Sequence, residues 1–343
     1  MAGPEAELDI ERPDALLAYL ERSGRIAPGE QSQLTNLRGG VSNRTVLITR
    51  PGGEAWVLKQ ALPKLRVEVD WFSSPERTHR EAEGLRWLSR LTPAGSVPRL
   101  VFEDRDRNLL AMEAAPRPHR NWKELLLEGE VDGDLVRQFG TLLGTIHRSG
   151  SEQRDGVAKV FDDRSFFESL RLEPYHLFSA ERTPAAAPFL TDLVAETRRE
   201  RLTLVHGDYS PKNILVHRGR LILLDHEVIH FGDPAFDLGF ALTHLLSKAH
   251  HLKGARDTFL KAGEEFWQSY LKALGEVPWL AKLEGRAVRH TLACLLARAC
   301  GRSPLEYLGP AARAAQRNAV LTLLTTPPQR TPDLIRRFAK ELP

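Results

Sequence analysis

The sequence changes its hydrophobic pattern near Pro116, and this change constrains the fold of the 343-residue chain most strongly. Before Pro116, short apolar runs bounded by turn residues predict four strands: 45–49, 55–59, 98–102 and 108–112. A helix is expected at 80–91, and beyond Pro116 the periodicity is mainly helical, apart from a strand pair at 214–224. We therefore expect an α+β fold of two lobes: a small antiparallel-sheet lobe with one packed helix at 1–115, and a larger, mainly helical lobe at 116–343.

Two shorter segments are assigned from their prolines. Pro13 suits the first turn of a helix that leucines at helical spacing continue, so residues 1–34 are expected to form a helical extension of the first lobe. The stretch 180–188 combines two prolines with several alanines and predicts a loop.

Composition and charge exclude several classes of protein. The net charge of +3, from 48 Lys and Arg against 45 Asp and Glu, does not favour a nucleic-acid partner. Two cysteines exclude a disulfide scaffold and favour a reducing compartment. No apolar run approaches the ~20 residues that span a bilayer, and the N-terminus lacks a signal-peptide pattern. The expectation is a cytoplasmic protein without a membrane partner, whose oligomeric state the pattern does not indicate.

The most informative stretch runs through 205–216 and continues through a short turn to Asp225. Two apolar runs around a glycine-containing turn predict a hairpin in it. Asn213 precedes the first strand and Asp225 follows the second, so both lie at the open end of this hairpin. Asp208 lies five residues before Asn213, in the loop that leads to it. Three oxygen-bearing side chains are therefore expected to converge on one place.

These side chains match the needs of phosphoryl transfer. Amide and carboxylate oxygens suit a hard cation such as Mg²⁺, which also binds water and substrate phosphates. Asp208, left off the metal, could accept a proton from a hydroxyl group or orient it. In the alternative interpretation, Asp208 and Asn213 only stabilise turns, and Asp225 is an ordinary loop acid.

The same stretch resembles a known family. His-Gly-Asp at 206–208, followed by Asn213 and then by Asp225, is similar to the catalytic and metal motifs of the aminoglycoside phosphotransferase and choline kinase-like family. These are small-molecule kinases with a bilobal protein-kinase-like fold, and the run 231–239 is also typical of them. The resemblance implies that Asp208 is the catalytic base, that Asn213 and Asp225 are magnesium ligands, and that the cofactors are Mg²⁺ and ATP, with GTP as the alternative.

The first lobe offers a loop that suits phosphates. Gly39 and Gly40 would let the backbone approach them closely, and Ser42 and Asn43 add polar side chains before the first strand. A Gly-Gly pair before a strand is otherwise an ordinary turn, so this loop gains its meaning from its neighbours.

Lys59 ends the second strand and is expected to pair with Glu81. Glu81 shares one helical face with Leu85 and Leu88, where an unpaired acid would be costly. The pair would satisfy this acid and direct the Lys59 ammonium toward phosphates, as in kinases of this fold. The rival partner, Glu83, points away from that face.

Residues 108–115 resemble the last strand of the first lobe and the inter-lobe hinge of related kinases. The resemblance implies that main-chain groups of Glu113 and Ala115 bind adenine. These two residues complete the nucleotide site predicted for the first lobe.

Other polar residues near the motif are interpreted as structural. Asp233 is expected to cap the helix that begins near Ala235, and Asp237 to cap it or, by the resemblance, to brace the catalytic loop. His226 is interpreted as structural, and His147 as a hydrogen-bonded core histidine. Three further histidines are expected on a solvated helix end: His244, His250 and His251.

The predicted function is an ATP-dependent small-molecule kinase that transfers the γ-phosphoryl group to a hydroxyl of a sugar or sugar-like acceptor. The stretch 281–320, expected to help form the acceptor side, has seven basic and two acidic residues, which disfavours a polycationic acceptor unless these side chains form a solvated face. The alternatives are an aminoglycoside or amino-alcohol (choline-like) kinase, and a nucleotide-binding pseudokinase or scaffold without turnover. A protein kinase is disfavoured, because no Ala-Pro-Glu segment follows Asp225.

Overall fold

The computed structural model describes residues 8–37, 40–66 and 70–343. Internal contacts divide the chain into two units. The first comprises the chain up to Trp87 together with Pro98–Pro116, and the second comprises Leu88–Val97 together with Arg117–Pro343. Among the described residues, no helix combines the length and the hydropathy needed to cross a membrane. The division gives no role to either unit, so nucleotide binding by the first lobe and acceptor binding by the second stay predictions.

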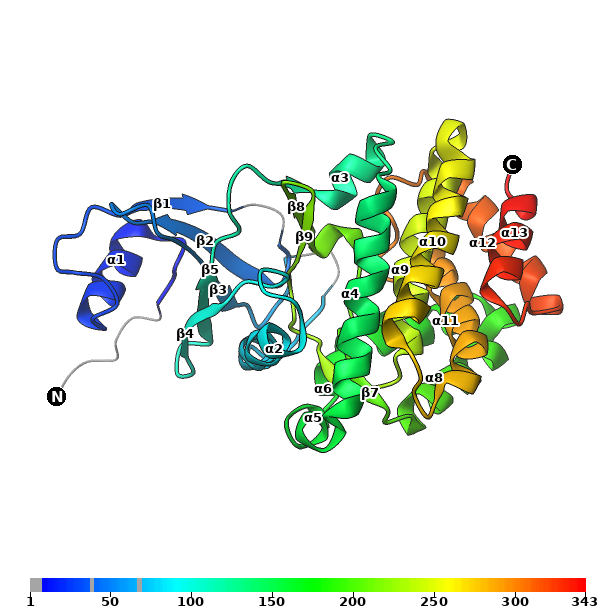
Figure 1. Cartoon of the computed structure of the whole chain (residues 1–343), viewed down its shortest axis with the longest axis horizontal. Coiled ribbons are helices and arrows are strands. Elements are labelled where there is room, and N and C mark those ends of the chain that lie inside the picture. Colours follow the sequence, from blue (N-terminus) through cyan, green and yellow to red (C-terminus); the bar gives the residue numbers. More distant parts are fainter. Residues whose placement is uncertain (1–7, 38–39, 67–69) are drawn as a thin grey trace. The chain divides into compact units, whose positions relative to one another are not determined.

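The first unit is built on a five-stranded antiparallel sheet with the strand order β1-β2-β3-β5-β4 (Figure 1). The strands are β1 Gln33–Asn36, β2 Asn43–Thr49, β3 Ala55–Ala61, β4 Leu100–Asp104 and β5 Leu109–Glu113. Two helices accompany them, α1 Pro13–Arg22 and α2 Arg77–Leu91. The apolar pattern predicts all of these elements except β1, whose four residues Gln-Leu-Thr-Asn are mostly polar.

The two helices cover opposite faces of this sheet. Successive residues of a strand point to opposite faces. Leu109 of β5 packs in one core with Leu16 of α1, whereas its neighbour Leu110 packs in another core with Leu85 of α2. The sequence predicts one helix packed on this sheet, which is α2. The structure adds a second packed helix, α1, from the N-terminal extension.

The second unit is mainly helical and contains two small sheets. One sheet holds β6 Arg120–Asn121, β8 Ile214–His217 and β9 Arg220–Leu223, and the other holds β7 Thr203–Val205 and β10 His230–Gly232. The α-helices are α3 Trp122–Leu127, α4 Gly133–Glu152, α5 Arg154–Phe161, α6 Ser165–Phe167, α7 Phe178–Arg182, α8 Ala187–Arg199, α9 Ala235–His251, α10 Arg256–Leu274, α11 Leu280–Cys300, α12 Pro310–Thr325 and α13 Thr331–Glu341. A π-helix, η1, spans Glu168–Leu177, and 3₁₀ turns lie at Pro184–Ala186, Pro211–Asn213 and Lys253–Ala255.

The prediction of a loop at 180–188 is wrong. These residues belong to the end of α7, a 3₁₀ turn and the start of α8. Pro188 lies in the first turn of α8, where its missing N–H needs no partner. The proline that indicates a loop in the sequence therefore marks the beginning of a helix.

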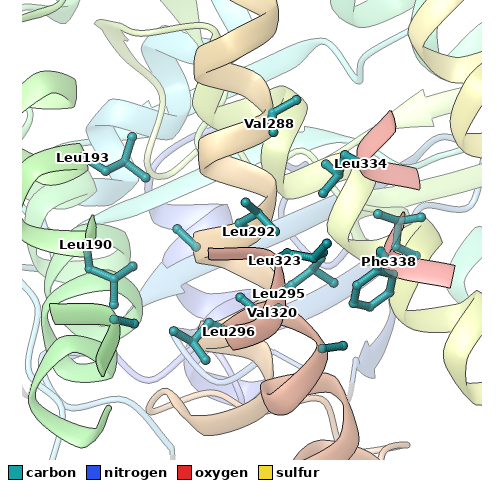
Figure 2. Packing of buried hydrophobic residues seen from close by; sticks show 14 of the residues in the cluster. Leu190, Leu193, Val288, Leu292, Leu295, Leu296, Val320, Leu323, Leu334 and Phe338 are labelled. Atoms are coloured by element: carbon teal, nitrogen blue, oxygen red, sulfur yellow. The ribbon is translucent and has the colours of Figure 1, made fainter. Parts of the chain in front are cut away.

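One core cluster of the second unit surrounds α11. Figure 2 shows leucine, valine and phenylalanine side chains of α8, α11, α12 and α13 gathered in one cluster. Leu292 of α11 is completely buried there, as is Leu246 of α9. The core thus fixes α9, the helix whose first turn reaches the candidate site.

Helices α4 and α10 approach each other closely at two glycines. A Cβ atom on Gly140 would overlap the carbonyl oxygen of Phe266, and one on Gly144 would lie 2.5 Å from that of Tyr270. Both positions of α4 therefore require glycine. The close contact brings the Tyr270 hydroxyl to within 3.0 Å of Nδ1 of His147, one turn further along α4.

We predict that Gly144→Ala lowers the free energy of unfolding by about 1–3 kcal/mol, because the added methyl group must push α10 away. The matched control is Gly285→Ala in α11, where an added Cβ meets no atom within 4 Å. This control should be neutral or stabilising by about 0.5–1 kcal/mol, since alanine favours a helix over glycine. Urea unfolding followed by circular dichroism measures both; equal stability of the two variants would contradict the close packing.

Candidate active site

The β8–β9 hairpin sets the positions of Asn213 and Asp225. Ile214 pairs with Leu223 in the antiparallel register, and the N–H of Leu224 donates to the carbonyl oxygen of Asn213 at 2.9 Å. Asn213 and Asp225 therefore flank the open end of the hairpin, as the sequence pattern predicts. Asp225 adopts a left-handed backbone conformation with φ 67°, which ends the extended chain at this point.

Asp208 lies beside Asn213, and both residues are buried. Nδ2 of Asn213 donates to Oδ2 of Asp208 at 2.8 Å and to the Asp208 carbonyl oxygen at 3.0 Å. These bonds use the amide nitrogen and leave the amide oxygen as the atom that Asn213 can offer to a cation. The convergence of Asp208 and Asn213 expected from their spacing is present in the structure.

Two cations contact the carboxylate of Asp208. Nη2 of Arg171 lies 2.9 Å and Nζ of Lys212 lies 3.2 Å from its Oδ2. Burial alone would raise the pKa of Asp208, but the two cations and the Asn213 hydrogen bond outweigh burial and lower it. Oδ2 receives all of these contacts, and no hydrogen-bond donor in the described part of the chain reaches Oδ1.

The sequence does not reveal Arg171 as a site residue. Arg171 lies in η1, and its nitrogens also donate to the carbonyl oxygens of Gly207 at 2.8 Å and Leu170 at 2.7 Å. π-Helical turns often occur at functional sites, but no residue pattern in η1 marks one beforehand. Lys212 does lie inside the motif, yet a loop lysine is usually exposed, so its position alone does not single it out.

Asp237, near the start of α9, holds the loop that carries Asp208. Its two carboxylate oxygens accept hydrogen bonds from the N–H of His206 at 2.7 Å and from the N–H of Gly207 at 2.8 Å. Gly207 adopts φ 78°, and a Cβ atom there would lie 2.9 Å from the carbonyl oxygen of Val228. Asp237 therefore braces the loop that carries Asp208, as the resemblance implies, while Oδ1 of Asp233 accepts a hydrogen bond from the N–H of Ala235, the first residue of α9, at 3.0 Å.

The carboxylate of Asp237 is in turn held by helix α4. Nε2 of His147 lies 3.2 Å from its Oδ2, and Nδ1 of the same ring lies 3.0 Å from the Tyr270 hydroxyl. Burial raises the pKa of Asp237, but His147 and the other partners outweigh it and the net shift is downward. His147 is thus the hydrogen-bonded core histidine that the sequence predicts.

His206 and His226 support the loop from the inside. The N–H of Asp208 donates to Nδ1 of His206 at 3.2 Å, so this ring carries its proton on Nε2. Nε2 of His206 lies 3.1 Å from Nδ1 of His226, which accepts that proton in a hydrogen bond. Burial lowers the pKa of His206 and favours this neutral form. The contact agrees with a structural interpretation of His226.

In the first unit, a buried arginine holds the residues after the glycine pair. Arg77 is completely buried, and its guanidinium donates to the carbonyl oxygen of Ser42 and, at 2.8 Å, to that of Leu62. Nδ2 of Asn43 donates to Oγ of Ser42 at 3.0 Å. The contact of Ser42 and Asn43 with phosphates stays a prediction, and Gly39 lies outside the described residues.

Lys59 and Glu81 form the ion pair expected from the sequence. Nζ of Lys59 on β3 lies 2.7 Å from Oε1 of Glu81 on α2, and the Glu81 side chain is only 1% exposed. The rival, Glu83, instead pairs with Arg86 at 2.6 Å. The Lys59 ammonium is therefore fixed by a buried carboxylate, while its contact with phosphates stays a prediction.

The predicted adenine contacts lie at the end of β5. The N–H of Glu113 donates to the carbonyl oxygen of Arg99 at 2.9 Å, and the N–H of Ala114 donates to that of Ala55 at 2.9 Å. The Glu113 carboxylate pairs with the Arg99 guanidinium, 2.9 Å from its Nε. The sheet thus uses these two N–H groups, and adenine binding through Glu113 and Ala115 stays a prediction.

The donor set at the hairpin suits a hard divalent cation. Asn213 offers an amide oxygen and Asp225 a carboxylate, at the same end of the hairpin. No group of three or more His, Cys, Asp and Glu side chains forms a metal cluster in the described ranges. Mg²⁺ needs no such cluster, because it binds one or two carboxylates and completes its shell with water and substrate phosphates.

Known proteins are similar to this chain over most of its length. The phosphotransferase enzyme family matches residues 33–276. Methylthioribose kinase 2 of Oryza sativa subsp. japonica is 25% identical over 307 residues, covering 77% of this chain and 71% of the relative. The methylthioribose kinase of Pectobacterium carotovorum is 26% identical over an alignment of 248 residues that covers 62% of this chain and 62% of the relative.

A solved structure shares the fold. An amicoumacin kinase in complex with AMP-PNP and Ca²⁺ superposes with a TM-score of 0.58 at 17% identity, covering 89% of this chain and 91% of that one. This likeness confirms the protein-kinase-like fold predicted from the sequence. The family match spans the hairpin residues and the Lys59–Glu81 pair alike. The chain therefore belongs to the phosphotransferase enzyme family, as a small-molecule phosphotransferase that acts on a hydroxyl group.

Proposed function

We propose that the protein transfers the γ-phosphoryl group of ATP, with Mg²⁺ as cofactor, to a hydroxyl group of a small sugar-like acceptor. The observation that carries this proposal is the carboxylate of Asp208, whose Oδ2 contacts Arg171, Lys212 and Asn213. The methylthioribose kinases among the relatives support a sugar-like acceptor.

Asp208 is the residue that we assign to the acceptor hydroxyl. Because Oδ2 is engaged by three groups, Oδ1 accepts the hydrogen bond of the hydroxyl and directs its oxygen toward the phosphorus. As the new oxygen–phosphorus bond forms and the bond from the γ-phosphorus to the bridging oxygen breaks, the hydroxyl proton passes to Oδ1. The lowered pKa of Asp208 makes it a weak base, so orienting the hydroxyl is its larger contribution.

Asn213 and Asp225 are assigned to the cation, through the amide oxygen and the carboxylate. When bound, Mg²⁺ would neutralise the charge that develops on the nucleotide phosphates. Asn213 has a second task, because its Nδ2 holds the Asp208 carboxylate at 2.8 Å. The Asn213 side chain therefore contacts Asp208, which is assigned to the acceptor, and also belongs to the cation site with Asp225.

The nucleotide is assigned to the first unit. Lys59, held by Glu81, would contact the phosphates, and the 42–43 segment would support them. The six residues assigned to ATP, with GTP as the alternative donor, are Ser42, Asn43, Lys59, Glu81, Glu113 and Ala115.

Two of the seven basic residues of 281–320 are paired with acids from outside this stretch. Arg286 pairs with Glu200 at 3.0 Å, and Arg289 pairs with Asp192 at 2.6 Å. Acids outside this stretch therefore neutralise two of its arginines, so the positive balance counted along the sequence overstates the free positive charge of this stretch. The preference for a sugar-like acceptor rests on the relatives instead.

We also propose a cytoplasmic location and a small-molecule acceptor as the partner. Both cysteines, Cys294 and Cys300, are free thiols, as expected in a reducing compartment.

A phosphorylation screen read by ADP release tests the proposal. The panel holds sugars and sugar derivatives including methylthioribose, together with amino alcohols, nucleosides and aminoglycosides, at fixed ATP and Mg²⁺. The highest kcat/KM is expected for a sugar derivative. A higher kcat/KM for an aminoglycoside or an amino alcohol would favour those acceptors instead, and ATP binding without transfer to any acceptor would favour a pseudokinase.

We predict that Asp208→Asn lowers kcat about 100- to 10,000-fold while leaving ATP binding largely intact, because the carboxylate acts on the acceptor. Asp225→Ala is the contrasting variant, and it should weaken magnesium-dependent ATP binding, since it removes a charged ligand. Steady-state kinetics with the best acceptor of the screen and calorimetry with ATP measure the two effects. A near-normal kcat in Asp208→Asn, or unchanged magnesium-dependent binding in Asp225→Ala, would refute the corresponding assignment.

A double-mutant cycle is expected to show that Lys59 and Glu81 act as one unit. Lys59→Ala removes the ammonium and Glu81→Ala misplaces it, so the two losses in kcat/KM should be strongly non-additive. The pair Glu83 and Arg86 on the same helix is the control, and its substitutions should change kcat/KM little. Fully additive losses at Lys59 and Glu81 would count against the assigned role.

A further inference from the structure

A cluster of polar side chains in the second unit has no role in the proposed mechanism. This cation cluster consists of His244, Lys248, Arg298 and Tyr307. Lys248 is completely buried, while His244 is 5% and Arg298 8% exposed. The expectation of a solvated helix end is wrong for His244 and His250, because α9 is buried from Ala235 to His250, whereas His251 is exposed.

The two cations of this cluster have only neutral partners. Nζ of Lys248 lies 3.4 Å from the carbonyl oxygen of His244 and 5.3 Å from the ring centre of Tyr307. Nη1 of Arg298 donates to Oγ of Ser303 at 2.9 Å and to the hydroxyl of Tyr175 at 3.3 Å. Within the described residues, neither cation forms an ion pair with a carboxylate, in contrast to the other buried arginine of α11, Arg286.

Several polar atoms of the cation cluster lack partners as well. Nε of Arg298, Nε2 of His244 and the hydroxyl oxygen of Tyr307 are buried without a hydrogen-bond partner in the described part of the chain. Buried polar atoms are normally satisfied, so each exception needs an explanation. Two cations and three polar groups without partners in one place together indicate a binding site for an anion.

The charges around the cation cluster are predominantly positive. Burial, together with Lys123 and Arg298, lowers the pKa of Lys248 to about 7, against the opposite effect of Glu306. Glu306 is paired with Lys123, and its side chain is 61% exposed. The nearby carboxylate is therefore already neutralised at the surface and does not compensate the buried cations.

Tyr175 connects the cation cluster to the catalytic carboxylate. Cζ of Arg298 lies 5.6 Å and Cζ of Arg171 lies 5.8 Å from the ring centre of Tyr175. Arg171 contacts Asp208 at 2.9 Å, and both Arg171 and Tyr175 belong to the π-helix η1. Arg298 is thus separated from the partner of Asp208 by a single aromatic ring.

We propose that the cation cluster binds an anionic group of the acceptor, a carboxylate or a phosphate monoester, while Asp208 contacts the hydroxyl that is phosphorylated. The inference rests on the proposed function and narrows it from sugar-like compounds to sugar acids and sugar phosphates. The guanidinium of Arg298 and the ammonium of Lys248 supply charged hydrogen-bond donors for such an anion. His244 and Tyr307 supply neutral hydrogen-bonding groups, whose Nε2 and hydroxyl oxygen have no partner among the described residues.

Calorimetry on the full chain without nucleotide tests this inference with three probes: ribose, ribonate and ribose 5-phosphate. At least one anionic probe should bind about 10- to 100-fold more tightly than ribose, as charged hydrogen bonds imply. Comparing ribonate with ribose 5-phosphate shows which anion fits. Lys248→Met and Arg298→Gln should each abolish most of the difference, whereas Arg289→Gln, which changes a carboxylate-paired arginine of the same helix, should keep it.

The folded state of each variant is checked by thermal melting. Lys248→Met removes a buried charge at similar volume, so it provides a folded variant even where Arg298→Gln unfolds the chain. Equal affinities for all three probes, no detectable binding of either anion, or a preference that survives in both cluster variants would overturn the inference. The proposed function fails separately, when neither neutral nor acidic sugars are phosphorylated in the ADP-release screen.

Discussion

The position of the loop that carries Asp208 depends on one buried carboxylate, that of Asp237. A carboxylate without partners in a protein interior is very costly, and Asp237 avoids this cost by accepting two backbone N–H groups and facing His147. Those N–H groups belong to the two residues immediately before Asp208. The hydrogen bonds that stabilise the Asp237 carboxylate therefore also fix the position of the Asp208 carboxylate. His147 is held by Tyr270, and their contact requires the glycines that bring α4 and α10 together. The position of Asp208 therefore follows from helix packing outside the site.

The carboxylate of Asp208 is electrostatically asymmetric. Its Oδ2 contacts Arg171, Lys212 and Asn213, whereas Oδ1 has no donor among the described residues. An ionised carboxylate held on one side has a fixed direction for its second oxygen, which suits the orientation of a hydroxyl group. In the proposed mechanism strong basicity is not required of Asp208, because phosphoryl transfer depends mostly on positioning and on neutralising charge.

Features that depend on residues close in sequence could be predicted, whereas contacts between segments distant in sequence could not. The hairpin with Asn213 and Asp225 at its open end follows from residues close in sequence, and Glu81 is recognisable because an acid on an apolar helix face needs a partner. Arg171 is not recognisable, because η1 has no sequence signal and its contact with Asp208 joins distant segments. The burial of α9 likewise comes from surrounding helices, which the sequence of α9 does not display.

The burial of helix α9 limits which of its residues can be substituted. Asp237 lies in its first turn and Lys248 eleven residues later, about 16 Å away along the axis. Because the helix is buried from Ala235 to His250, it has no solvent-facing side on which substitutions are tolerated. A movement of α9 would therefore disturb packing along its whole length. New acceptor preferences are therefore expected to arise by substitution in α11 and the segment after it, with α9 left unchanged.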